Sequence, residues 1–315
     1  MSERIDQICD NLSVRLTAVD HRIKSFKAGV DSAKAKTKAI FTIRRFSGPR
    51  APFAGLCAAL VALLASQPAA HAQDAADLAK QVTNPIASLI SVPFQWNYDQ
   101  GFGTADGDRW TLMVQPVIPF SLNEDWNLIT RTVLPIKSQN NNFGMSGSQF
   151  GLGDITEWLV FSPVQPTSFG MIWGAGPIIY IPTATDPLLG ADTWGAGPTA
   201  IGLFLNGPWT LGALGNHIWS FDGSDTINSS FVQPFVAFTT PDAWTFTLNS
   251  ESTYNWNTSE WSIPINAMVA KLVNIGGRPV QLQAGARYYA ASTTGGASGL
   301  GARFQVNFLY PKAGP

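Results

Sequence analysis

The clearest pattern in the chain is an alternation of apolar and polar residues near its C-terminal end. Over residues 300–310, apolar side chains stand at every second position, and the residues between them are Gly301, Arg303, Gln305, Asn307 and Leu309. Side chains of a β-strand point to opposite faces in turn, so one face meets an apolar environment and the other meets water or polar partners. The closing strand of a transmembrane β-barrel has this pattern, and so does a strand half-buried in a soluble sandwich.

The same two-residue period recurs along the chain and predicts twelve strands. Their expected positions are close to 92–98, 110–120, 126–136, 150–162, 169–182, 194–205, 209–221, 230–239, 244–256, 261–273, 279–290 and 299–310. An even number of strands places both ends of a bacterial barrel on the same side of the membrane. In the fourth of these strands the direction of the side chains is ambiguous, because Asp154 and Glu157 have opposite parity and cannot both face inward without a bulge.

The connections between these strands alternate in length. Five are long and rich in Asn, Asp, Ser and Gly, near 99–108, 137–149, 183–193, 222–229 and 291–298. The others are tight, near 121–125, 163–168, 206–208, 240–243 and 274–278. Long loops at one rim and short turns at the other are typical of outer-membrane barrels.

Two kinds of residue favour a membrane barrel over a soluble sandwich. Trp126, Trp209 and Trp244 each follow a tight turn, which predicts an aromatic girdle at the periplasmic interface, although core tryptophans of a soluble β protein are the alternative. The polar faces of strands 244–256 and 279–290 carry amides, hydroxyls and few charges, whereas a soluble surface would be rich in Lys and Glu. An enclosed, hydrated interior explains that composition.

Composition supports the same fold class. Hydrophobic residues make up 45% of the chain and charged residues 13%, about half the charged fraction of an average soluble domain. After residue 72 no apolar run approaches the roughly 18 residues that a membrane-spanning helix needs. We therefore predict an all-β chain that forms a transmembrane, antiparallel, up-and-down β-barrel of about 12 strands. Such a barrel has a narrow lumen.

The first 72 residues differ from the rest. Three arginines precede an apolar run at 53–65, and Ala70-His71-Ala72 follows as a cleavage site of small residues. We interpret 44–72 as a secretory signal peptide and 1–43 as a charged extension that a misassigned start codon could explain. Residues 73–90 form a plug or a periplasmic segment with a helical pattern, residues 91–310 form the barrel and 311–315 a tail.

Charge and cysteine content narrow the list of partners. Residues 1–72 hold 11 of the 20 Lys and Arg residues, five of the 21 acidic residues and both cysteines, which leaves a net charge of −7 beyond them. Nucleic acid is then an unfavoured partner, and neither a disulfide nor a thiolate metal site is available. We expect no cofactor and no metal. The expected partners are outer-membrane lipid, a small-molecule solute and, during biogenesis, the barrel-assembly machinery.

Six sequence blocks carry a family resemblance. They are PIASLISVPFQ at 85–95, QPVIPFSL at 115–122, WNLITRT at 126–132, GLGDI at 151–155, IWGAGP at 172–177 and FQVNFL at 304–309. Together they resemble a family of outer-membrane transporters labelled for the meta-cleavage pathway of phenol degradation. The resemblance implies an outer-membrane barrel that passes small hydrophobic or aromatic compounds. It covers nearly all of the chain after the predicted signal peptide, and it names no substrate contact.

The candidate transport residues are the charged and amide side chains expected to face the lumen. They are Asn127, Arg131, Asp154, Asn249, Glu251, Gln283, Arg287, Arg303, Gln305 and Asn307. We expect interior arginines to pair with acids, since an unpaired charge there is costly. The same residues could instead only hold the lumen shut.

Three functions remain open. A narrow channel for passive diffusion of small, possibly aromatic, solutes ranks first, and a structural or adhesive barrel without transport ranks second. A barrel enzyme acting on lipid ranks last, because His217 is the only histidine after residue 72. Its parity places it on the lipid-facing side, and the sequence signals no nucleophile near it.

Overall fold

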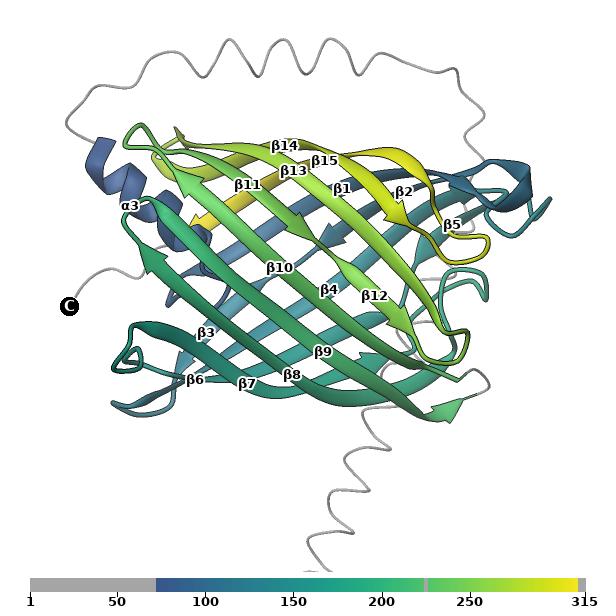
Figure 1. Ribbon diagram of the computed structural model, residues 1–315, viewed down its shortest axis with the longest axis horizontal. Coiled ribbons are helices and arrows are strands. Elements are labelled where there is room, and N and C mark those ends of the chain that lie inside the picture. The colour runs from purple at the N-terminus through teal and green to yellow at the C-terminus, as the bar shows by residue number, and fades with distance from the viewer. Residues whose placement is uncertain (1–71, 224–225, 311–315) are drawn as a thin grey trace, which may run out of the picture. The chain divides into compact units, whose positions relative to one another are not determined.

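The computed structural model describes residues 72–223 and 226–310, so the predicted extension, signal peptide and C-terminal tail lie outside the described residues. The described part is nearly all strand, arranged as a closed antiparallel barrel with one helix at its end (Figure 1). In chain order the elements are α3 (Ala72–Val82), β1 (Ile90–Phe102), the 3₁₀ turn η2 (Gly103–Ala105), β2 (Gly107–Val114), β3 (Val117–Ser121), β4 (Trp126–Asn140), β5 (Ser148–Leu152), β6 (Ile155–Pro163), β7 (Met171–Ile181), β8 (Thr193–Asn206), β9 (Trp209–Gly223), β10 (Asn228–Thr239), β11 (Trp244–Ser250), β12 (Ser252–Asn255), β13 (Glu260–Ile275), β14 (Arg278–Ala291) and β15 (Gly299–Tyr310).

These fifteen strand segments form twelve barrel strands, as predicted. Three barrel strands are interrupted, between β2 and β3, between β5 and β6, and between β11 and β12. Closure comes from β1 and β15, which pair antiparallel from Ile90 opposite Tyr310 to Tyr98 opposite Ala302. Every strand therefore has a neighbour on both sides, which hydrocarbon requires because water is absent there to bind free backbone groups.

The strands are longer than the sequence pattern predicts. The β1–β2 ladder continues to Phe102 opposite Gly107, and β4 continues to Asn140, which pairs with Ser148. The loops expected near 99–108 and 137–149 are therefore shorter than predicted and span only 103–106 and 141–147, so the expected bounds were wrong. Cross-strand hydrogen bonds override the low β-propensity of Asn, Asp and Gly at these positions.

The two rims of the barrel still differ. The short-turn rim holds the connections 122–125, 164–170, 207–208, 240–243 and 276–277. The loop rim holds, among others, the connections 103–106, 141–147, 182–192, 256–259 and 292–298. Of these, 182–192 is the longest, and it folds against the inside of the wall.

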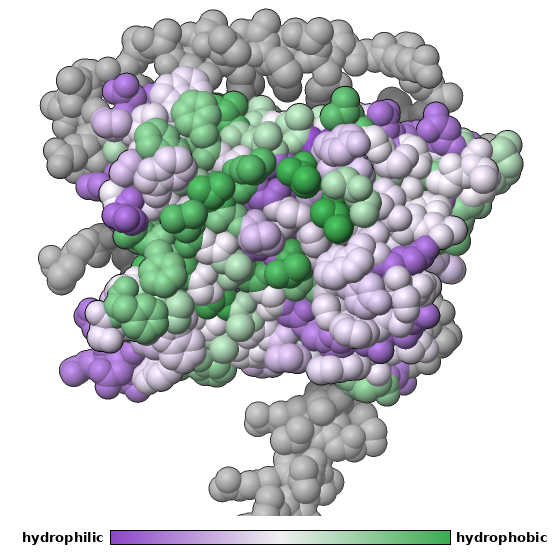
Figure 2. All heavy atoms as spheres, in the orientation of Figure 1, coloured by the Kyte–Doolittle hydropathy of each residue, from purple (hydrophilic) through white to green (hydrophobic). Residues whose placement is uncertain are grey.

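The outer face of the barrel is apolar. Trp126, Leu211, Phe246 and many similar side chains are more than a third exposed and share the outward parity of their strands. On the face seen in Figure 2, hydrophobic side chains gather over the wall and hydrophilic ones toward its two ends. Trp126, Trp209 and Trp244 begin β4, β9 and β11 at the short-turn rim, where the predicted girdle would lie.

Helix α3 lies at the short-turn rim (Figure 1). Ala79 is fully buried there in a cluster with Ala243, Leu272 and Leu309. Two polar contacts add to this packing, since the Lys80 ammonium donates to the Gly207 carbonyl and the hydroxyls of Thr83 and Thr210 lie 2.7 Å apart. The segment between α3 and β1 then enters the end of the lumen.

A repeated Trp-Gly-Ala-Gly-Pro motif, at 173–177 in β7 and 194–198 in β8, places two prolines directly opposite each other. The β6–β7 and β8–β9 ladders each skip two residue pairs beside it, where a proline has no N–H to donate. The neighbouring strands approach closely at the glycines. A Cβ atom at Gly197 would lie only 1.6 Å from the His217 carbonyl oxygen.

Gly197→Ala should therefore destabilise the barrel by about 1–3 kcal/mol, because the added methyl group must push β9 away. The loss of stability is measured on SDS gels, as the temperature at which samples change from the mobility of the folded barrel to that of the unfolded chain. Gly202→Ala in the same strand is the control, since its nearest atom would be Met171 Sδ at 3.6 Å. Equal midpoints for the two variants would contradict the predicted clash.

Candidate functional site

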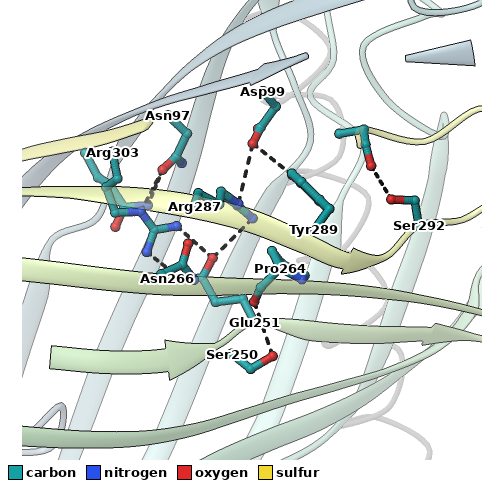
Figure 3. A network of polar contacts seen from close by, with 12 residues as sticks. Asn97, Asp99, Ser250, Glu251, Pro264, Asn266, Arg287, Tyr289, Ser292 and Arg303 are labelled. Carbon is teal, nitrogen blue, oxygen red and sulfur yellow. Dashed lines mark hydrogen bonds and ion pairs between the residues drawn. The ribbon is translucent and has the colours of Figure 1, made fainter. Parts of the chain in front are cut away.

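The lumen contains a network of ion pairs centred on Glu251 (Figure 3). The Glu251 carboxylate accepts two hydrogen bonds from Arg303, Nη1 to Oε1 and Nη2 to Oε2, each 2.7 Å long. Arg287 Nη2 lies 3.4 Å from Oε2 of the same carboxylate. A bidentate arginine–carboxylate pair is among the strongest polar contacts in proteins, so Glu251 links its own strand to β14 and β15 on the inner face of the barrel.

Further polar residues extend this network toward the loop rim. Asp99 lies 3.4 Å from Arg287 Nε and accepts a 2.8 Å hydrogen bond from the Tyr289 hydroxyl. Arg303 Nε donates a 2.7 Å hydrogen bond to Asn97 Oδ1. Asn97, Asp99, Arg287 and Arg303 are buried and Tyr289 is partly buried, and Figure 3 shows these residues converging from β1, β14 and β15. The expected pairing of interior arginines with acids is thus present.

Local backbone geometry aims Glu251 inward. It occupies the break between β11 and β12, where its N–H donates to the carbonyl of Pro264 on β13. The register with β10 and β13 is the same on both sides of the break, so Glu251 keeps the inward parity of Asn249 and Thr253. Ordinary strand alternation therefore directs its carboxylate into the lumen at the height of the arginines.

Between the network and the short-turn rim lies a cavity of about 480 Å³. Residues 81–85, 87 and 89 line it at the α3 end, and Arg131, Glu251 and Arg303 are among the residues that line it elsewhere. Apolar side chains of β6, β7, β9 and β10 also line this cavity, beside amides from β1, β14 and β15. The cavity is therefore amphipathic.

The connection 182–192 occupies the lumen on the loop-rim side. Asp154 accepts two hydrogen bonds from this loop, from the Ala184 N–H at 2.9 Å and the Ala191 N–H at 2.6 Å, and a third from the Tyr180 hydroxyl of β7 at 2.7 Å. Lys137 Nζ donates to the Leu189 carbonyl at 2.8 Å, and the Leu189 side chain is 1% exposed. Asp154 thus fixes an inward-folded loop.

The structure places the ten candidate transport residues in four kinds of position. Most line the cavity: Arg131, Asn249, Glu251, Gln283, Arg303, Gln305 and Asn307. Arg287 belongs to the ion-pair network, and Asp154 holds the loop. Asn127 has the inward parity of Arg131 but lies near the start of β4, away from the network.

Several residues of the lumen were not predicted from the sequence. Asn97 and Asp99 are 0% and 4% exposed, and Gln115 accepts a hydrogen bond from Arg131. The alternation of Phe94, Trp96 and Tyr98 with polar neighbours was the signal that could have found the first two.

Asp154 and Glu157 do differ in direction, since Asp154 contacts the inward loop whereas Glu157 accepts a 2.6 Å hydrogen bond from the outward-facing Thr132.

His217 has a hydroxyl neighbour that the sequence did not signal. Its Nδ1 lies 2.7 Å from Oγ of Ser230, which the β9–β10 register places directly opposite. The Trp256 indole N–H also donates to this Oγ, at 2.9 Å. His217 Nε2 is buried and has no hydrogen-bond partner among the described residues, so the pair lacks the third group that orients a catalytic histidine.

Among the described residues, no helix is long and apolar enough to span a membrane. In the same part of the chain, no group of three or more His, Cys, Asp or Glu side chains is arranged to hold a metal ion.

The fold is similar to solved outer-membrane barrels. The COG4313 outer membrane channel from Pseudomonas putida F1 matches with a TM-score of 0.57 and 14% identity, over 71% of this chain and 96% of its own. The chain has the fold of a bacterial outer-membrane β-barrel. Two weaker likenesses are to other outer-membrane barrels. The outer membrane phospholipase dimer of Salmonella typhi with bound calcium has a TM-score of 0.46 and 11% identity, over 73% of this chain and 97% of its own. The KdgM porin in complex with disordered oligogalacturonate has a TM-score of 0.40 and 9% identity, over 71% of this chain and 99% of its own. No protein-family model and no curated protein matches the sequence.

Glu251→Gln should destabilise the barrel by about 3 kcal/mol, because Arg303 and Arg287 would each lose their shared carboxylate while remaining buried. Urea unfolding followed by tryptophan fluorescence measures the change. Glu124→Gln, in an exposed turn of the short-turn rim, is the matched control. If Glu251→Gln and the control unfold alike, the network adds nothing to stability.

Asp154→Ala should release the inward loop, because three hydrogen bonds to one side chain disappear together. In a chain with Cys9 and Cys57 replaced by Ser and Leu189→Cys added, we expect a water-soluble maleimide to label the new thiol about tenfold faster after Asp154→Ala. That ratio corresponds to the loss of one net hydrogen bond of about 1.4 kcal/mol. Glu157→Gln, which faces outward from the same strand, should leave the labelling rate unchanged.

Proposed function

We propose that the chain is an outer-membrane channel that passes small solutes by passive diffusion along its narrow lumen. The observation that carries this proposal is the cavity of about 480 Å³ inside a closed barrel, lined by side chains from many of its strands. Cavities of this size hold small molecules. Passage requires movement of the residues at its two ends, 81–89 on one side and the loop 182–192 with the ion-pair network on the other.

The mixed lining supports small amphipathic or aromatic solutes. Amide groups such as those of Gln283 and Gln305 replace some hydration of a polar group, while Trp158 and Phe231 contact an apolar body. This agrees with the resemblance to transporters labelled for phenol degradation and with the fold likeness to an outer membrane channel. The solute moves down its own concentration gradient in this proposal.

A barrel without transport is the second candidate, and one observation favours it. The ion-pair network fills the lumen beyond the cavity, where the Arg303 side chain is only 2% exposed. A structural barrel would keep this arrangement permanently. We propose no catalytic role for the chain, since the His217–Ser230 pair has no orienting third group among the described residues.

The channel and the closed barrel differ in their response to removal of residues 73–89. These residues contribute α3 and one end of the cavity, and they precede the first paired residue of β1. In planar bilayers we expect discrete conductance steps from the protein, and larger steps after the deletion, because the α3 end of the cavity then opens.

Lys80→Ala is the matched control, because it removes one contact of α3 with the turn at Gly207 and leaves the segment in the lumen. We expect its conductance to stay much closer to that of the unchanged protein. A barrel that folds but is electrically silent with and without residues 73–89 would contradict the channel proposal and favour the structural barrel.

A further inference from the structure

Arg131 differs from the other arginine that lines the cavity. Arg303 binds the Glu251 carboxylate with two hydrogen bonds. Arg131 has a neutral partner instead, since its Nη2 donates a 2.5 Å hydrogen bond to Gln115 Oε1. No carboxylate of the described residues lies within 4.0 Å of it. Arg131 therefore has donor capacity that Arg303 does not.

The charge balance of the cavity is also incomplete. Two arginines, Arg131 and Arg303, line it with a single carboxylate, Glu251. Arginine stays protonated in proteins, so the cavity lining carries one excess positive charge. A cation enclosed by the barrel wall is stabilised by an anion much more than a cation on an open surface would be.

Beside Arg131 the wall is apolar. Arg131 pairs across the sheet with Trp158, and Trp158 pairs with Ile178 on the next strand. The guanidinium carbon lies 5.3 Å from the Trp158 ring centre. The apolar surface continues around the cavity through Leu214, Ile218, Phe231 and Phe235.

The Trp158 side chain supplies a second donor without an acceptor. It is 9% exposed, and its Nε1 has no hydrogen-bond partner among the described residues. A buried indole N–H ordinarily has such a partner. The Arg131 guanidinium and the Trp158 indole N–H thus lie next to each other. Both side chains are hydrogen-bond donors with unused capacity, and neither can accept a hydrogen bond.

We propose that Arg131 is the anchor of a binding site for a small monocarboxylate with an apolar body, such as an aromatic carboxylate. The carboxylate pairs with the Arg131 guanidinium, and the apolar body lies along Trp158, Ile178 and the phenylalanines of β10. This inference rests on the proposed function, because it names the class of solute that the channel takes. It assigns the polar end of the solute to β4 and its apolar end to β6, β7, β9 and β10.

Benzoate and its uncharged isostere benzamide test the site with the unaltered chain. We expect benzoate to quench tryptophan fluorescence with an affinity about tenfold or more above that of benzamide, as one charge-assisted hydrogen-bonded pair provides. Equal affinities, or no quenching by either compound, would overturn the proposal without any variant.

Arg131→Gln should remove the preference for benzoate, whereas Arg131→Lys should keep part of it, because an ammonium retains the charge but not the planar pair of donors. Arg278→Gln, exposed at the start of β14, is the control and should bind as the unaltered chain does. A preference that survives Arg131→Gln would exclude Arg131 as the anchor.

Conductance in potassium chloride separates this inference from the channel proposal. Steps that persist in Arg131→Gln while benzoate binding is lost would support both. Steps without any preference for benzoate in the unaltered chain would overturn the binding site and leave the channel. Binding of benzoate by a barrel that never conducts would support the site and overturn the channel.

Discussion

The pairing of β1 with β15 is the constraint on which the rest of the structure depends. A sheet in hydrocarbon can have no free edge, and the antiparallel ladder from Ile90–Tyr310 to Tyr98–Ala302 removes the last one. Once the sheet is closed, alternate side chains of every strand must point into an enclosed interior that lipid cannot reach. The polar halves of the strands then lie together, and each charged group among them needs a partner. The ion pairs of Glu251 with Arg287 and Arg303 follow directly from closure.

The strand breaks belong to the same solution. They lie at Gln115-Pro116, at Gly153-Asp154 and at Glu251, and each break contains a polar side chain directed inward. Only at Gly153-Asp154 does the register shift by one residue, from Ile136 opposite Leu152 to Val133 opposite Thr156, so that an extra side chain faces the lumen. That side chain, Asp154, holds a loop. At the other two breaks the register is unchanged, and Glu251, which neutralises arginines, and Gln115, which binds Arg131, keep the inward parity of their strands. Irregular backbone is thus placed where the interior needs polar groups, while the regular ladders carry the apolar outer face.

The sequence predicts the wall of the barrel better than its contents. Alternation along residues 300–310 and the other strands depends only on local parity, so the number of strands and the inward direction of Arg303, Gln283 and Arg131 followed from it. Contacts between side chains depend on register, which the sequence alone does not reveal. Asn97 meets Arg303, and Ser230 meets His217, only because particular residues of neighbouring strands are paired. Polar residues at strand ends were read as loops for a related reason. Their preference for turns is real in isolation, but a neighbouring strand that supplies hydrogen bonds outweighs it.

The two ends of the lumen are held by forces of different kinds, and this difference decides where a passage can open. Beyond the cavity, charged groups from nearby strands along one side of the barrel bind one another, and separating them leaves buried charges unpaired. At the short-turn rim, α3 and the residues after it are held by apolar packing, in which Ala79, Ile86 and Leu89 are buried, and by single polar contacts of Lys80 and Thr83. When such a segment moves away, apolar surface is exposed at a cost of about 25 cal/mol per Å², but no charge is left buried, because its polar groups meet water. The same segment, 81–89, forms part of the cavity lining. Displacement of that segment therefore opens the cavity at the short-turn rim while the ion pairs that hold the wall stay intact.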